Sequence, residues 1–395
     1  MKWLKYLLLL FAILLSMRAF GGNIPIPSQF VSVIFTIILL IYSIWNNRFG
    51  IHSSYLFFFI YLAITIVIAN PDPVFKSWDR LAYFSVMLLL IAPIVENQRI
   101  RFIRNLLFNY ILVIFIFLSI GSFVAYFLGI NLMRSDGELD ITVAGHFGGL
   151  TCQSMTLGPI AGTASCYFLN LFFKQKKKLW VVLAFLSFVT VLMAASRGAL
   201  IATIGGIFSV VYLRSTDFSS ILKKILIVLF IGLVSFPLWE EYTLGVIQKS
   251  QDVNRAGMFD SRTTKVTARL AEFESSPIYG VGFASIDPNG IDSFKADTGT
   301  IEPGSSLLAI FSMTGIIGFL FVFYLNFQTF KQLRKSNTEE RVLYQSIIIL
   351  FLIHMIIEGY IFSISNPLSI FYWLLLGVSY DTKYEDYSIR VPLIR

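Results

Sequence analysis

The sequence predicts an all-α polytopic membrane protein with about twelve transmembrane helices. Of its 395 residues, 56% are hydrophobic and only 14% are charged, and the mean hydropathy is +0.75. Soluble domains carry about 25% charged residues, so this composition excludes an ordinary soluble protein. The apolar runs are separated by short segments, except for one long segment at residues 239–301. We therefore expect residues 1–395 to form a single membrane domain that carries one large loop.

Each predicted span is long enough to cross a hydrocarbon core of about 30 Å as a helix. The first resembles a signal peptide, because Lys2 and Lys5 precede the run LLLLFAILL. No small-residue cleavage site follows and Arg18 interrupts the run, so we expect it to remain as a span. The predicted spans are 4–20, 29–45, 54–70, 80–95, 103–129, 147–173, 179–195, 198–213, 220–238, 304–330, 342–361 and 366–380.

The distribution of basic residues predicts the orientation of the spans. With alternating spans and a cytoplasmic N-terminus, 20 of the 31 lysines and arginines fall on the inner side and 5 in short outer loops. Basic residues concentrate in cytoplasmic loops of membrane proteins, so both termini are expected in the cytoplasm and 239–301 outside it. The net charge of +8 is then a topology signal, and no nucleic-acid partner is expected. Cys152 and Cys166 lie in or beside one apolar span, which argues against a disulfide framework or a zinc site.

Arg197 is the only charged residue between Leu179 and Leu213. Basic segments expected on the inner side flank this stretch, so it must cross outward and return, with the turn at Ala195–Gly198. In a purely structural interpretation, Arg197 reaches lipid phosphates from the membrane edge. Because the hairpin has almost no loop, we instead expect Arg197 to lie slightly below the outer surface, facing other helices in a functional role.

The centre of the long loop, DSRTTKVTARLAEFESSP, predicts an amphipathic helix. Its apolar stripe is Val266, Leu270 and Phe273, and its basic stripe is Arg262, Lys265 and Arg269. Pro277 ends the helix and Gly280-Val281-Gly282 forms a turn. The guanidinium groups suit a phosphate or diphosphate, because their planar fork binds oxyanions at two points. There are two alternative interpretations of this basic stripe. It could be a solvated face against anionic lipid headgroups, or its residues could form ion pairs with Glu272 and Glu274.

Four ionisable residues could carry acid–base chemistry near the outer face. His354 and Glu358 are four residues apart on one predicted span, so one helix face is expected to hold both, and a carboxylate there needs a partner. Glu358 could be structural, and His354 alone fits a hydrogen-bonded core histidine better. His146 opens another span and could simply be interfacial, and Glu302 could be a base or a carboxylate favoured by a helix N-terminus.

Several nucleotide and metal signatures are absent from the sequence. There is no Walker A motif, no glycine-rich dinucleotide fingerprint, no His-x-x-x-His pair and no DxD-type acidic cluster. No cofactor and no metal are therefore expected. An enzyme of this kind would take its energy from an activated substrate, and an outer-face site in a membrane favours a lipid-linked one.

Four segments resemble the O-antigen ligase and polymerase family of bacterial inner membranes. They cover roughly residues 140–380 in the family's order. They are GHFGGLTCQSMTLGP, the Ser-Arg stretch ASRGALIATIGG, the loop stretch SSPIYGVGFAS and the span SSLLAIFSMTGIIGFLFVFYL.

This resemblance implies a metal-independent membrane glycosyltransferase of the C type. The donor would be a glycan on undecaprenyl diphosphate, whose anomeric carbon is attacked by an acceptor hydroxyl while the lipid diphosphate leaves. Arg197 matches the family's Ser-Arg arginine and Arg262 an arginine ahead of the loop helix, so both would bind the diphosphate with Lys265 and Arg269. Glu302, Glu358 or His146 would serve as the base.

The resemblance also indicates which activity to expect. Many ligases have a His-Asn pair before the Gly-x-x-Gly, and here that place is Gly304-Ser305. This departure favours a polymerase that joins lipid-linked repeat units into O-antigen, capsule or exopolysaccharide, with membrane lipids and a chain-length regulator as partners. The alternatives are a ligase that transfers glycan to lipid A core or protein, and a lipid-linked oligosaccharide flippase or transporter.

Overall fold

The computed structural model describes residues 2–22, 29–45, 48–133, 147–215, 258–288, 294–295, 299–301, 303–336, 338–363 and 365–387. The described part is mostly helical, with very little sheet. Its α-helices are α1 Lys2–Ser16, α2 Gln29–Ile44, α3 Ser53–Ala69, α4 Ser77–Ile91, α5 Gln98–Phe127, α6 Ser154–Gln175, α7 Lys178–Met193, α8 Arg197–Leu213, α11 Met258–Ser275, α12 Ser306–Lys335, α13 Arg341–Ile357 and α14 Pro367–Asp381. Three 3₁₀ helices are η1 Met17–Ala19, η2 Pro73–Phe75 and η3 Thr382–Tyr387. Short antiparallel pairs join β1 Gly50–Ile51 to β2 Val95–Glu96, and β3 Phe294–Lys295 to β4 Thr300–Ile301.

Helices occupy eleven of the twelve ranges predicted as spans. The remaining range, 220–238, lies outside the described residues. The amphipathic helix predicted in the long loop is α11, which ends two residues before Pro277. Within the described residues, α5 and α12 are long and apolar enough to cross a membrane. For the shorter helices, the crossing stays a prediction.

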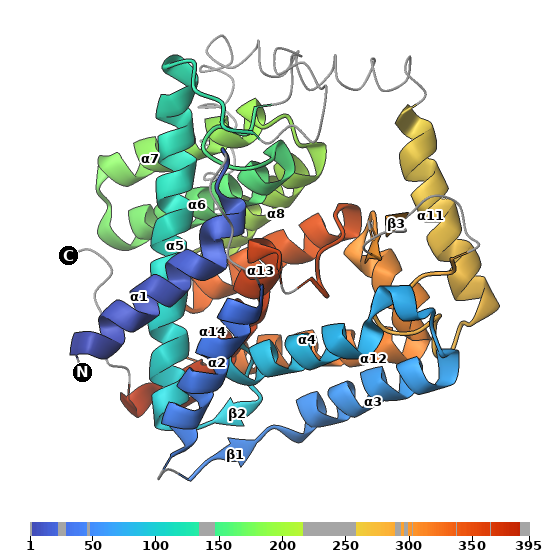
Figure 1. Cartoon of the computed structure of the whole chain (residues 1–395). Coiled ribbons are helices and arrows are strands. Elements are labelled where there is room, and N and C mark those ends of the chain that lie inside the picture. Colours follow the sequence, from blue (N-terminus) through green and yellow to red (C-terminus); the bar gives the residue numbers. More distant parts are fainter. Residues whose placement is uncertain are drawn as a thin grey trace.

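The helices form two neighbouring groups joined by one apolar core (Figure 1). In one group α6, α7 and α8 pack together, and α8 lies along α13. In the other, α3 packs on α4 and α12, and α14 lies between α5 and α12. The core includes fully buried aromatic rings on several helices, among them Phe84, Phe115 and Trp373. The α11 helix stands at the edge of the molecule against α12.

Segments predicted on the inner side contact one another. Glu96 in β2 forms an ion pair of 3.1 Å with Lys383 in η3. The fully buried guanidinium of Arg104 binds both carboxylate oxygens of Asp381 at 3.0 Å. The first pair joins β2 to η3 and the second joins α5 to the end of α14, and alternating spans place all four segments on one side.

Segments predicted on the outer side also meet. The amide of Cys152 donates to the carbonyl of Ala19 at 2.9 Å, which joins the ends of two predicted spans. Arg80, at the start of α4, donates to the carbonyl of Gly299 in the long loop at 2.6 Å. These contacts agree with the alternation predicted from the basic residues.

A break in α12 receives the loop that follows α11. Gly315 has φ 63° and ψ −169°, a conformation outside the helical region. The carbonyl of Ser312 accepts the amide of Val281 at 2.8 Å, and the amide of Ile316 donates to the carbonyl of Pro277 at 2.9 Å. The loop therefore satisfies two of the backbone groups that the helix break leaves without an intrahelical partner.

Candidate functional site

Arg197 lies at a tight turn between two helices, as predicted. The α7 helix ends at Met193, and Ala195 adopts a left-handed φ of 48°. Ser196 caps α8, accepting the amide hydrogen of Ala199 at 3.4 Å. Arg197 is therefore the first residue of α8, and its side chain is exposed while Ser196 and Gly198 are buried. Its exposed side chain lies at the start of the helix, and the expectation that it faces other helices stays a prediction.

Small residues bring this end of α8 close to α6 and α13. A Cβ on Gly198 would lie 3.0 Å from Ile357, the last residue of α13. On the other side, a Cβ on Gly158 of α6 would overlap Ala199. Small residues allow such close approach of membrane helices. The turn that carries Arg197 is thereby fixed beside the residue that precedes Glu358.

The beginning of α12 is bonded to the end of α13 by two buried serines. Ser305 caps α12 and donates to the carbonyl of Ile356 at 2.7 Å. Ser306 donates to the carbonyl of Glu358 at 2.8 Å and accepts the amide of Tyr360 at 2.9 Å. No pattern in the sequence indicated this structural role for either serine. Their side chains hold the backbone on both sides of Glu358 in a fixed position.

Glu358 and His354 do not share a helix face, contrary to the prediction. The α13 helix ends at Ile357, and Glu358 is an extended C-cap residue with φ −120° and ψ 139°. Its side chain is half-buried. His354 is fully buried within α13, with Nδ1 3.0 Å from the hydroxyl of Tyr360. The interpretation of His354 as a core histidine fits this contact.

Lys265 reaches the same region from α11. Gly304, with a left-handed φ of 74°, lies so close that a Cβ there would be 3.4 Å from the Cβ of Lys265. A Cβ on Gly359 would overlap Pro303 and lie 3.2 Å from the amide nitrogen of Gly304. The segment 303–304, immediately after Glu302, is therefore held between Lys265 and the residue that follows Glu358.

Arg269 faces the interior, and the predicted basic stripe is not one exposed surface. Its side chain is 1% exposed and forms an ion pair of 2.9 Å with Glu272. Glu272 also accepts the amide of Asp287 at 3.0 Å. Burial raises the pKa of the Glu272 carboxyl, and the Arg269 guanidinium opposes that rise. The intrahelical ion pair, weighed as an alternative from the sequence, is the arrangement observed.

The predicted apolar stripe of α11 divides between two environments. Val266 and Leu270 are exposed, whereas Phe273 packs edge-on against Phe311 of α12 at 5.3 Å. Because Arg269 and Glu272 neutralise each other as an ion pair, the helix can bury its charged side and leave two aliphatic residues outside. This exposed aliphatic pair is suited to a membrane surface.

Three predicted site residues lie wholly or partly outside the described part of the structure. His146 and Glu302 lie outside the described residues, and Arg262 lies in α11 with a side chain that is not described. Within the described residues, no group of three or more histidine, cysteine, aspartate or glutamate side chains could hold a metal ion. The structure thus brings Arg197, Lys265 and Glu358 to connected backbone segments, and it places Arg269 in a buried pair.

Part of the chain matches a known family. Residues 182–323 match the family model described as O-antigen ligase. This range includes the turn at Arg197, the whole of α11 and the first part of α12 with its break at Gly315. No curated protein matches the chain. This match to part of the chain supports membership of the O-antigen ligase and polymerase family, whose members are membrane glycosyltransferase-like enzymes.

Proposed function

We propose that the chain is a polymerase that joins undecaprenyl-diphosphate-linked oligosaccharide repeat units at the periplasmic face of the bacterial inner membrane. The main support is a series of close contacts that connects three segments of the chain. They are the start of α8 with Arg197, the α11 residue Lys265, and the junction of α12 and α13 beside Glu358.

The lipid diphosphate would bind between Arg197 and Lys265, with Arg262 as a further contact. The exposed guanidinium of Arg197 stands at the N-terminus of α8, where the helix dipole also favours an anion. An acceptor sugar hydroxyl attacks the anomeric carbon of the donor, the bond to the diphosphate breaks, and the diphosphate leaves with the electron pair. Cationic groups in place before the reaction stabilise this developing negative charge.

Glu358 is the proposed base among the three candidates. Its side chain is half-buried and Ser306 fixes its backbone, which suits a carboxylate that accepts a proton from the attacking hydroxyl. Glu302 immediately precedes Pro303, which packs on Gly359, so it remains the second candidate from the same junction. His146 is the third.

The proposed topology places both termini in the cytoplasm and residues 239–301 in the periplasm. The contacts Glu96–Lys383 and Arg80–Gly299 support it, because each joins segments assigned to one side. A periplasm-active reporter fused at Asp287 should be active, and the same reporter after Arg395 should be inactive. An inactive fusion at Asp287 would contradict the placement of the whole site.

A ligase is the second candidate, because the matched family includes both activities. The absence of a His-Asn pair at Gly304-Ser305 favours the polymerase. Ser305 occupies that place as a helix cap, with its hydroxyl bound to α13. The family match gives no support to a flippase.

Deletion of the gene separates the two candidates. Loss of a polymerase should leave surface glycan of a single repeat unit. Loss of a ligase should remove attached glycan while long lipid-linked polymer accumulates. A chain-length regulator is a proposed partner, and cells without it should make polymer of altered length.

A further inference from the structure

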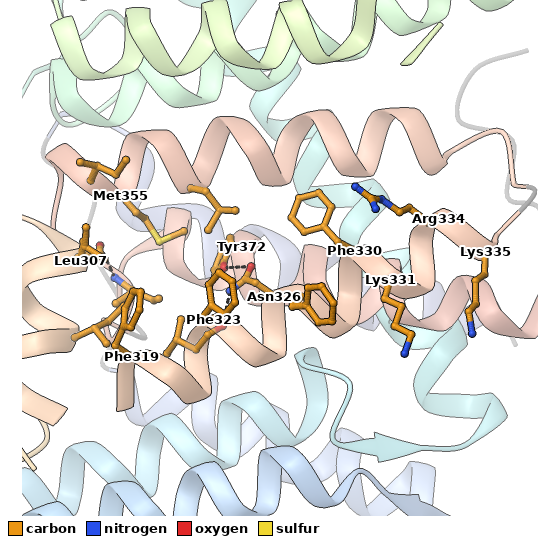
Figure 2. A pocket seen from close by; sticks show the side chains of 17 residues that line it. Leu307, Phe319, Phe323, Asn326, Phe330, Lys331, Arg334, Lys335, Met355 and Tyr372 are labelled. Atoms are coloured by element: carbon orange, nitrogen blue, oxygen red, sulfur yellow. Dashed lines mark hydrogen bonds between the residues drawn. The ribbon is translucent and has the colours of Figure 1, made fainter. Parts of the chain in front are cut away.

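A long apolar groove begins at the junction of α12 with α13 and runs along α12 to the C-terminal end of that helix. Its volume is about 620 Å³, and Figure 2 shows it extending from Leu307 and Phe319 to Lys335. The walls come from α12, from α13 and from Tyr372 of α14. Its middle is lined by Phe319, Val322, Phe323, Phe327, Phe330 and Leu352. The one polar pair in this stretch is satisfied, since Tyr372 donates to Asn326 at 2.6 Å.

One end of the groove is cationic. Lys331, Arg334 and Lys335 line it together and all three side chains are exposed. Within the described residues, none of the three forms an ion pair with a carboxylate. The groove therefore combines an apolar channel with a terminal site for an anion.

We propose that this groove binds an acyl chain of an anionic phospholipid, with the lipid phosphate held by Lys331, Arg334 and Lys335. The stretch from Phe319 to Phe330 rises about 16 Å along a helix. One leaflet of a hydrocarbon core is about 15 Å thick. An acyl chain in this stretch thus places its headgroup at the level of the three cations. Basic pockets between transmembrane helices bind anionic headgroups in this manner on the cytoplasmic side.

The charge pattern separates this lipid from the glycan donor. The proposed diphosphate site lies at the Ser306 end of α12, whereas the three cations lie at its C-terminal end, on the predicted cytoplasmic side. A polyprenyl tail that entered from the Ser306 end would not require cations at the far end. The proposal stands independently of the polymerase assignment, because its test measures lipid binding and not glycan synthesis.

The test is the binding of dioleoyl phosphatidylglycerol to the purified full-length protein. Thermal unfolding in a neutral detergent is followed during titration with this lipid or with dioleoyl phosphatidylcholine. We expect phosphatidylglycerol to raise the unfolding temperature at lower concentration than phosphatidylcholine. The triple variant K331Q/R334Q/K335Q should weaken the apparent affinity about tenfold or more, without lowering the unfolding temperature of the lipid-free protein.

Two further variants test the place of binding. The matched control K176Q/K177Q/K178Q removes the same charge from another predicted cytoplasmic segment and should change the affinity less than about twofold. Leu352→Trp narrows the apolar channel and should weaken phosphatidylglycerol binding with the cations intact. Equal weakening in the control triple, or equal affinity for the two lipids, would overturn the proposal. So would a polyprenyl diphosphate that displaces phosphatidylglycerol from the groove and depends on the same three cations.

Discussion

The amide of Ile316 in α12 donates a 2.9 Å hydrogen bond to the carbonyl of Pro277 in the loop after α11. In an unbroken helix this amide would bond to Ser312, whose carbonyl instead accepts the amide of Val281. The loop after α11 and the break in α12 thus form one structural unit, although they lie far apart in the sequence. The large loop is attached to α12 through its backbone, next to the proposed site.

This attachment depends on Gly315, so Gly315→Ala should destabilise the protein. The backbone conformation there is one that side chains rarely adopt, and a Cβ would overlap the carbonyl of Ile278. Strain of this kind costs about 1–3 kcal/mol, before the overlap is added. Thermal unfolding in detergent measures the loss. The control is Gly129→Ala, because Gly129 also has a positive φ but has no atom within 4 Å of a Cβ. An equal shift in both variants would argue against tight docking of the loop.

Arg197→Ala should abolish polymer formation while the protein stays in the membrane at near-normal amounts. Loss of one contact to developing negative charge costs about 10²- to 10³-fold in rate. Arg197→Lys should also lose most polymer, because an ammonium group cannot hold two phosphate oxygens in a planar fork. Glycan chain length and protein abundance are measured together. Arg48→Ala, an exposed arginine in another segment, is the control, and full-length polymer from Arg197→Ala would end the assignment.

Glu358→Gln should lower polymer formation by about 10²-fold or more if the carboxylate is the base. The substitution keeps the side-chain shape and leaves the backbone bond to Ser306 in place. Single-turnover transfer by the purified protein gives the rate. Glu340→Gln, at the opposite end of α13, should have no effect. Unchanged transfer by Glu358→Gln would move the base assignment to Glu302 or His146.

Arg269→Ala should reduce the amount of folded protein and not the affinity for substrate. It leaves the carboxylate of Glu272 buried without its cation, which typically costs about 3–5 kcal/mol. The unfolding temperature of the purified protein reports this loss. Glu274→Ala, which changes an exposed residue of the same helix, should change stability by less than about 0.5 kcal/mol. A stable Arg269→Ala protein with weakened donor binding would instead support a role at the diphosphate.

Acid should release the C-terminal η3 segment from β2. Burial alone would raise the pKa of the Glu96 carboxyl, but hydrogen bonds from Tyr384 and Lys383 and the charge of Lys383 bring the pKa below its ordinary value. The pKa of Glu96 in the folded protein is lower than its ordinary value of about 4.3. The contacts of this carboxylate therefore stabilise the folded state fully above that ordinary value. This stabilisation is lost as the pH falls through the folded pKa.

Proteolysis at different pH values checks this expectation. Cleavage after Tyr384 by an acid-active protease should increase as the pH falls through the acidic range. Glu96→Gln should show the same increase already at neutral pH. A cleavage rate that is independent of pH in the wild-type protein would contradict the expected role of Glu96.

Composition and the placement of charge were sufficient to locate most elements. Long apolar runs favour helices in a membrane because a helix satisfies its own backbone groups. The turn at Arg197 followed from basic segments on both sides of it, and the loop helix followed from its periodicity and from Pro277. These are local properties of the chain, and the described helices agree with them.

Only the tertiary structure decided which side chains meet. The periodicity of α11 gives the angle between Arg269 and Val266 but not which of them faces α12. The packing selects the charged side, because Arg269 and Glu272 neutralise each other and Asp287 supplies a further bond. The end of α13 before Glu358 likewise depends on bonds to Ser306, which is 52 residues away. Such contacts join distant segments, and their energies do not appear in any local pattern of the sequence.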